Sequence, residues 1–322
     1  MIKRRIYEKV KFCYFRYIFR RYRKKKARFL FDLSDSRIGI GNIISVTPAI
    51  IAVKALCPDS LIDVKLKYKE LLQGREIIND LYDEDSPHRD NEYDFIFTHE
   101  LGKESRTINS LKLDVAVDKN ETRNHFEKIK LIGYMGEMPG LYVSIKSVDI
   151  PLPKDRLKIG IINCGKNENF GLNGESKSWP YYNELIRILL EDFRCRIYLI
   201  GGPYEKWKIK TAGEDIIDCI GKYTLPETAY ILKNCDVIIG NDCGPMRIAD
   251  AVGVRHYVIW GPTSPVKNGY LNNYFDIYNE KIACRPCQGK NKTEKCSHLE
   301  CLYGIKPADV ISVIEELKEW KK

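Results

Sequence analysis

Residues 236–260 constrain the fold of this chain more than any other stretch. A short apolar run at 237–239 is typical of a buried strand, and residues 241–244 (Asn-Asp-Cys-Gly) have the composition of a tight turn. Pro245 suits the first turn of a helix, Gly253 suits its end, and a second apolar run closes the stretch. The pattern predicts a strand, a turn, a helix and a second strand. Free N–H groups at such a helix start favour a phosphate.

Similar alternation of strands and helices runs through the rest of the chain, which favours parallel sheets in an α/β fold. The 322 residues are rather many for one core, and prolines at 151 and 153 are typical of a linker. We therefore expect a basic aromatic tail at 1–28 and two Rossmann-like domains, at 29–150 and 151–322. The expected strands are 28–33, 62–66, 94–97, 157–163, 196–200 and 216–220, and the expected helices are 43–56, 71–81, 126–135, 182–191, 204–212, 226–233 and 307–320.

Positive charge is concentrated at the N-terminus. Residues 1–28 hold thirteen Lys and Arg against one acid, Glu8, which gives +12 and leaves 9 − 12 = −3 for the rest of the chain. Aromatic and aliphatic residues alternate with these charges, as in a helix lying on an anionic membrane surface. A solvated basic tail and a nucleic-acid-binding tail are the alternatives. Because no nucleic-acid motif occurs elsewhere, we do not expect a nucleic-acid partner.

Scattered single cysteines and the lack of a recognisable signal peptide favour a reducing cytoplasm. No run of about 18 apolar residues occurs. With the basic tail, these features predict a peripheral protein on the inner face of the cytoplasmic membrane.

Five elements, in the right order, resemble those of glycosyltransferase family 9, the lipopolysaccharide heptosyltransferase family. They are Gly41–Ala49, Lys177–Pro180, Gly201–Glu205, Asp242–Gly253 with the following Gly-Pro turn, and Cys284–Cys287. The resemblance implies the GT-B type of fold, with two Rossmann-like domains facing across a cleft. It also implies inverting, metal-independent transfer of a sugar from a nucleotide-sugar donor to a lipid-linked or surface saccharide, with no catalytic cofactor.

The resemblance places the donor site in the second domain. Lys177 is expected to neutralise the donor diphosphate, Glu205 to accept hydrogen bonds from ribose hydroxyls, and Leu225 to pack on the base. Asp242 would orient the turn or contact the donor sugar, or would cap the following helix.

Two residues of this donor motif depart from the family pattern. Cys243 replaces Thr or Ser, and Arg247 replaces the usual His. The N–H groups of Cys243 and Gly244 can still supply the dipole of the helix start. Arg247 would either make a bidentate contact to the diphosphate or be a solvated helix residue.

Asn42 stands where the family carries its proposed catalytic Asp, and an amide cannot accept a proton at neutral pH. Either another carboxylate is the base, such as Asp35 on the same loop or Glu92 on another, or the chain is a catalytically lapsed member that binds a nucleotide sugar or a partner protein. If position 42 faces the acceptor, Asn42→Asp should increase transfer. Among isolated histidines, His99 and His256 lie beside strands, as structural histidines do, and His125 falls near a family position on the acceptor side.

The cysteines at 284, 287, 296 and 301 have the spacing C-x2-C-x8-C-x4-C. Cys284, Cys287, Cys296 and Cys301 form either a four-thiolate structural zinc site or a set of reduced thiols, and His298 offers a substitute ligand. A catalytic role is not expected, because four thiolates leave zinc no open position.

Overall fold

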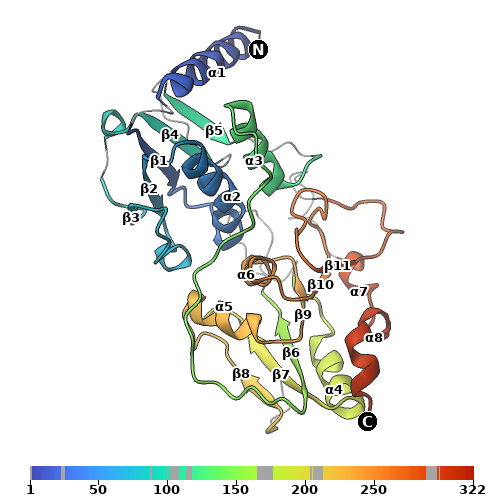
Figure 1. Ribbon diagram of the computed structural model, residues 1–322. Helices are drawn as coiled ribbons and strands as arrows, with labels where there is room; N and C mark the ends of the chain where they lie inside the picture. Colours follow the sequence, from blue (N-terminus) through green and yellow to red (C-terminus); the bar gives the residue numbers. More distant parts are fainter. Residues whose placement is uncertain are drawn as a thin grey trace. The chain divides into compact units, whose positions relative to one another are not determined.

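The computed structural model describes residues 2–22, 26–87, 89–99, 101, 109–113, 118–164, 177–203, 205, 213–287, 296 and 298–322. The chain divides into two compact units, Met1–Ser144 and Ile145–Lys322. Each unit has its own parallel β-sheet with helices packed on it (Figure 1). The two Rossmann-like domains expected from the sequence are thereby confirmed.

The first unit contains a five-stranded sheet in the order β3-β2-β1-β4-β5, in which every pairing is parallel. Helices α2 and α3 pack against each other. The elements are α1 (Ile2–Tyr22), β1 (Arg28–Leu33), α2 (Ile40–Leu56), β2 (Leu61–Leu66), the 3-10 turn η1 (Lys69–Leu71), β3 (Asp80–Tyr82), the 3-10 turn η2 (Asp90–Glu92), β4 (Phe95–His99), β5 (Ser110–Leu113) and α3 (Glu121–Leu131).

Phenylalanines on β1 and β4 hold α1 against this sheet. Phe29 stacks on Phe95 with their ring centroids 5.3 Å apart. Phe15 and Phe19 of α1 are fully buried, with ring centroids 5.2 and 5.1 Å from that of Phe95. Burying one such ring contributes about 1.5–3 kcal/mol. The N-terminal segment is therefore part of the packing of the first unit, and removing it would expose that unit's core.

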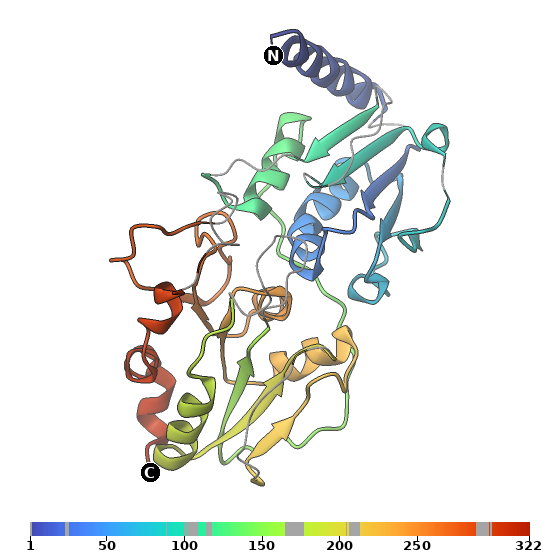
Figure 2. The same cartoon turned by 180° about the vertical axis from the view of Figure 1, so that it is seen from behind.

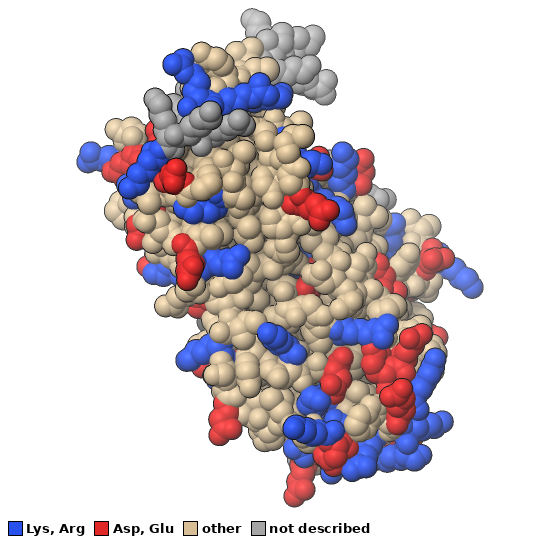
Figure 3. Space-filling view, in the orientation of Figure 1, with Lys and Arg blue, Asp and Glu red and all other residues tan. Residues whose placement is uncertain are grey.

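The opposite face of α1 is exposed and carries both aromatic rings and charges. Val10, Tyr14 and Tyr17 are 61%, 42% and 57% exposed, and Arg16 and Arg20 are exposed as well. Figure 3 shows Lys and Arg on α1, whereas both signs of charge are mixed over the rest of the visible face. No helix within the described residues is long and apolar enough to cross a membrane.

Three predicted helices of the sequence differ from the structure or lie outside it. The helix expected at 71–81 is wrong, since η1 ends at Leu71 and Gly74, at φ +76°, turns the chain toward the edge strand β3. The helix expected at 126–135 begins five residues earlier, at Glu121, where the Asn120 side chain caps it. Most of the helix expected at 204–212 lies outside the described residues.

The second unit contains a six-stranded parallel sheet in the order β11-β10-β9-β6-β7-β8. Helices α4 and α8 lie side by side near the C-terminus (Figures 1 and 2). The elements are β6 (Leu157–Ile162), α4 (Tyr182–Asp192), β7 (Cys195–Ile200), β8 (Ile216–Asp218), α5 (Leu225–Lys233), β9 (Val237–Asn241), α6 (Gly244–Val252), β10 (His256–Ile259), β11 (Tyr274–Ile277), α7 (Glu300–Tyr303), α8 (Pro307–Val313) and the 3-10 segment η5 (Glu315–Trp320).

The predicted strand–turn–helix–strand stretch is confirmed in β9, α6 and β10. Pro245 occupies the first turn of α6, and Gly253 ends the helix in the left-handed conformation at φ +75°. The predicted C-terminal helix is interrupted, because Ile314 leaves the helical conformation between α8 and η5.

Candidate functional site

Each sheet has a point where the strand order reverses, between β1 and β4 in the first unit and between β6 and β9 in the second. In open parallel sheets ligands bind beside the carboxyl ends of the strands at such points. Asn42 follows β1 and His99 ends β4, whereas Asp242 and Cys243 follow β9. The candidate residues of each unit therefore lie at the ligand-binding edge of that unit's sheet.

In the first unit, Asn42 contacts a buried carboxylate. Its Oδ1 accepts a hydrogen bond from the backbone N–H of Gly39 at 3.0 Å, which fixes the start of α2. Its Nδ2 donates to Glu121 Oε1 at 2.8 Å. Ser45, one turn further along α2, donates its hydroxyl to the same oxygen at 2.8 Å. The amide at position 42 therefore lies directly against a carboxylate that α3 supplies.

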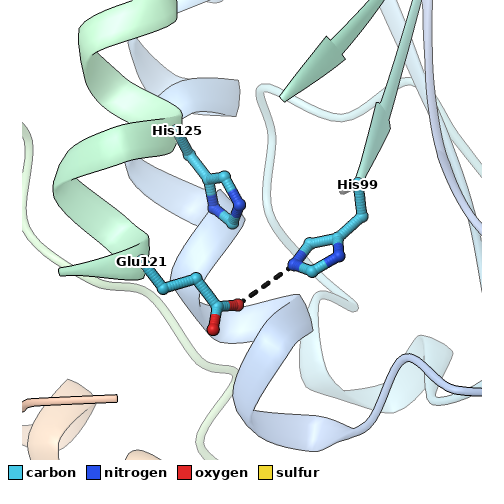
Figure 4. A group of neighbouring side chains, drawn as sticks. All are labelled: His99, Glu121 and His125. Carbon is cyan, nitrogen blue, oxygen red and sulfur yellow. Dashed lines mark hydrogen bonds and ion pairs between the residues drawn. The ribbon is translucent and has the colours of Figure 1, made fainter. Parts of the chain in front are cut away.

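Two histidines complete this group (Figure 4). His99 Nε2 lies 3.0 Å from Glu121 Oε1, and the ring of His125 meets that of His99 edge-on with centroids 4.9 Å apart. His99 Nδ1 accepts the backbone N–H of Leu101 at 3.2 Å, so Nε2 carries the proton and donates it to Glu121. The two histidines and the glutamate form a buried group whose potential ligand atoms lie within 4.8 Å of one another.

Glu121 is held in its ionised form. Burial alone raises the pKa of its carboxyl, but the hydrogen bond from His99, with further effects of His125 and Asn42, outweighs burial and leaves the pKa well below its usual range. The side chain is only 8% exposed. A buried anion with three donors on one oxygen is thus present beside position 42.

The carboxylates expected from sequence as substitutes for the family Asp have other surroundings. Asp35 forms a two-point ion pair with Arg37, with Nε–Oδ1 and Nη2–Oδ2 distances of 2.8 and 3.0 Å. Glu92 is exposed on η2. The role of Asp35 as a base stays a prediction, and its oxygens are already committed to a guanidinium.

In the second unit, Lys177 and Asp242 are paired at the reversal point between β6 and β9. Lys177 Nζ lies 3.5 Å from Asp242 Oδ2, and both side chains are nearly buried. Asn268 donates to Oδ2 at 3.0 Å and Tyr270 to Oδ1 at 3.2 Å. Burial raises the pKa of Asp242, but the Lys177 charge and the hydrogen bonds from Asn268 and Thr263 outweigh it, so the pKa is lowered.

The start of α6 is formed by Cys243 and Gly244. Cys243 is the N-cap residue, and no side chain caps this helix end. Asp242 therefore does not cap α6, because its carboxylate is turned to Lys177, Asn268 and Tyr270. The thiol of Cys243 is in hydrogen-bonding contact with that of Cys164, and this contact, together with burial, raises the pKa of Cys164 well above its usual range.

Arg247 is not the solvated helix residue that the sequence allowed as one of two alternatives. Its guanidinium is nearly buried and donates to the carbonyls of Gly269 at 3.0 Å and Asn268 at 2.7 Å. It also pairs with Asp250 at 3.1 Å and lies over the ring of Tyr270, 4.5 Å from the centroid. Arg247 thus fixes the segment that supplies hydrogen bonds to Asp242, and a direct contact with a diphosphate stays a prediction.

Glu205 and Leu225 lie near the carboxyl ends of β7 and β8. The carboxylate of Glu205 folds back over Gly202, where a Cβ would lie only 2.8 Å from Glu205 Oε2. The charge of Glu205 also helps to raise the pKa of Cys164, the thiol that contacts Cys243. Leu225 is the first residue of α5 and is half-buried.

The four C-terminal cysteines differ in their exposure and contacts. Cys284 is exposed, Cys287 is buried against the Pro262 carbonyl, and Cys301 belongs to the core under α7. Burial raises the pKa of the Cys301 thiol to about 11, with smaller contributions from the nearby Cys287, Cys296 and Cys284. Among the described residues, only the group His99–Glu121–His125 brings three potential ligands together. The structural zinc, with Cys296 as a further ligand, stays a prediction.

Glu121 is the functional candidate that the sequence pattern did not reveal. It lies in no recognised motif and its contacts come from residues 22, 76 and 79 positions away. The nearest signal was His125, one helical turn after Glu121 on the same face of α3.

Comparison with known proteins places the chain among sugar transferases. The profile of glycosyltransferase family 9 (heptosyltransferase) matches residues 93–298, a range that includes Glu121 and the donor motifs but begins after Asn42. Lipooligosaccharide heptosyltransferase 2 of Campylobacter jejuni is 23% identical over 214 residues, which cover 62% of this chain and 67% of that protein. Lipopolysaccharide heptosyltransferase 1 of Campylobacter coli is 25% identical over 185 residues, covering 53% of this chain and 49% of that protein.

Solved structures show the same fold. The glycosyl transferase family 9 protein of Veillonella parvula superimposes with a TM-score of 0.66 at 17% identity, covering 90% of this chain and 97% of that one. The E. coli ADP-heptose lps heptosyltransferase II gives a TM-score of 0.63 at 17% identity, covering 90% and 98%. From the family profile and the fold together, the chain belongs to glycosyltransferase family 9, the heptosyltransferase family.

Proposed function

We propose that this protein moves a sugar from a nucleoside-diphosphate sugar to a lipid-linked or surface saccharide, with inversion and without a catalytic metal. The observation that carries the proposal is the Lys177–Asp242 pair at the reversal point of the second sheet, beside the start of α6. It supplies a nearly buried cation and a helix-start dipole at the edge where such sheets bind ligands.

This arrangement suits a leaving diphosphate. Asp242, with its lowered pKa, stays ionised and holds the Lys177 ammonium in place before the ligand arrives. Arg247 and Tyr270 keep the neighbouring segment fixed, so little reorganisation is needed when charge develops on the leaving group. Glu205 remains our candidate for the ribose hydroxyls and Leu225 for the base.

ADP-linked sugars are the first donors to test, because the E. coli heptosyltransferase WaaC was solved with ADP and with ADP-2-deoxy-2-fluoro heptose. The acceptor is proposed to be a saccharide of a lipooligosaccharide or similar glycolipid, which is the class named for the Campylobacter relatives.

The test is a thermal-shift panel of ADP, UDP, GDP and CMP with their sugars. A ligand at about a hundred times its Kd stabilises by about 2.7 kcal/mol. Lys177→Ala should remove most of the shift, since it deletes the cation, whereas Lys154→Ala, at an exposed position of the same unit, should keep it. The proposal fails if none of the nucleotides or nucleotide sugars shifts the melting temperature of the wild type.

We further propose that the exposed face of α1 rests on the cytoplasmic surface of an anionic membrane. Two tyrosines and several arginines share that face, an arrangement that matches an interfacial helix, and Arg21 donates to the Tyr17 hydroxyl at 3.2 Å. Such a position would keep the enzyme near a lipid-linked acceptor.

A further inference from the structure

We propose that Glu121 is the general base of this enzyme, the carboxylate that takes the proton of the acceptor hydroxyl. The inference rests on the proposed glycosyl transfer and names the residue that position 42 itself cannot provide. Asn42 occupies the place of the proposed family carboxylate, and its Nδ2 lies 2.8 Å from Glu121 Oε1. A carboxylate is therefore present within one hydrogen bond of position 42, contributed by α3 instead of α2.

The two oxygens of Glu121 have different surroundings. Oε1 accepts all three hydrogen bonds, from Asn42, Ser45 and His99. Oε2 accepts no hydrogen bond from the described parts of the chain. It is also absent from the polar atoms that are both fully enclosed and unpartnered, so this oxygen keeps some accessible surface. The side chain retains 8% exposure. Oε1 thus anchors the group, and Oε2 is the oxygen that can meet a hydroxyl.

Hydrogen bonds that only hold α2 and α3 together would not need the buried negative charge of Glu121. Removing a carboxylate from water costs several kcal/mol, and a neutral amide could accept the same three hydrogen bonds. Here the fold instead surrounds Oε1 with three donors that keep the carboxyl ionised at the ligand-binding edge of the sheet. Buried, perturbed carboxyls at such an edge are typical of functional sites.

The tautomer of His99 argues for a proton-handling group and against a metal. Because the Leu101 N–H is donated to His99 Nδ1, the proton lies on Nε2 and points at Glu121. A metal on Nε2 would displace that proton and require the opposite tautomer, losing the Leu101 bond. His99 acts as a positioning residue that orients Glu121.

Proton transfer to Glu121 accompanies the displacement at the anomeric carbon of the donor. The acceptor oxygen forms a bond to the anomeric carbon of the donor while its O–H bond breaks and the proton passes to Glu121 Oε2. The bond from the anomeric carbon to the diphosphate breaks, and the nucleoside diphosphate leaves with the electron pair. The hydroxyl becomes acidic as the new C–O bond forms, so a carboxylate is an adequate base. The proton is then released to solvent.

Glu121→Gln is the decisive variant, because the glutamine oxygen can keep the three hydrogen bonds while the base is lost. We expect kcat for transfer from the ADP sugar to fall by about 10²–10⁴-fold, with nucleotide-induced thermal shift and melting temperature close to the wild type. Asp118→Asn, an exposed carboxylate just before α3, is the matched control and should retain activity. In the double variant Asn42→Asp/Glu121→Gln the carboxylate returns to position 42, and transfer should recover.

Three outcomes overturn the assignment. Glu121→Gln retaining wild-type turnover would show that the carboxylate only ties the helices together. Loss of wild-type activity on chelation, with one divalent ion per chain that His125→Ala releases, would make the group a metal site. A wild type that binds no nucleotide sugar at all would instead refute the proposed function on which the assignment rests, and the thermal-shift panel identifies that case separately.

Discussion

Replacing Asn42 by Asp places two carboxylates in direct contact, and the structure sets the size of the effect. The amide nitrogen that now donates to Glu121 Oε1 at 2.8 Å becomes an oxygen, while the bond from the Gly39 N–H can persist. With charge centres about 4 Å apart and an effective dielectric constant of about 20, repulsion between the two anions is about 4 kcal/mol. Repulsion of that size means that the second of the two carboxyl groups loses its proton only at about pH 7.

The sign of the pH dependence follows from which state holds the proton. His99 keeps Glu121 ionised, so the extra proton remains on the introduced carboxyl in the folded state. In the unfolded state that carboxyl ionises with a pKa of about 3.9. Near pH 4 the variant should have the same free energy of unfolding as the wild type. Between about pH 4 and about pH 7 this free energy should fall by about 1.4 kcal/mol per pH unit relative to the wild type, and above about pH 7 the difference should stay at about 4 kcal/mol.

Urea denaturation of wild type and variant in parallel from pH 4.5 to 8.5 measures this difference. Asn91→Asp, at an exposed position, is the charge-matched control and should show no such slope. Adding Glu121→Gln to Asn42→Asp should abolish the slope, because the second anion is gone. A pH-independent difference, or one that Glu121→Gln leaves unchanged, would refute the contact. The same repulsion reverses the sequence-based expectation: Asn42→Asp alone should lower transfer at neutral pH.

Two further predictions concern α1. Phe19→Ala should destabilise the protein by about 3–5 kcal/mol in urea titration, because the fully buried ring contacts Phe15, Phe29 and Phe95. Tyr17→Ala, on the exposed face of α1, should destabilise it by less than about 1 kcal/mol. Equal losses of stability in the two variants would contradict the packing of α1 on the sheet. The protein should bind vesicles that contain anionic lipid and dissociate from them as the salt concentration rises. Replacing Arg16, Arg20 and Arg21 by Glu should weaken this binding while the melting temperature stays near that of the wild type. Equal binding to neutral vesicles would rule out an electrostatic attraction between α1 and the lipid.

Local chemistry in the sequence determined the strand–turn–helix–strand stretch and the family. Pro245 and Gly253 act on the backbone where they stand, and apolar runs such as 237–239 form strands without reference to distant residues. The order of the motifs is also readable in the sequence. Through the family resemblance it assigns Lys177 and Asp242 to one donor site, and the structure shows these two side chains in contact.

Other features depended on which distant segments the fold brings together. The phenylalanines of α1 are on the buried face only because β1 and β4 present rings to them. The basic aromatic pattern that resembles a membrane-surface helix therefore also contains residues of the hydrophobic core. Arg247 is buried because the segment at 268–270 returns over α6. Glu121 lies beside Asn42 although 79 residues separate them, because α2 and α3 pack together at the edge of one parallel sheet. Periodicity and motifs record a residue's own neighbours in the chain, whereas the pairing of an amide with a distant carboxylate is decided by tertiary packing.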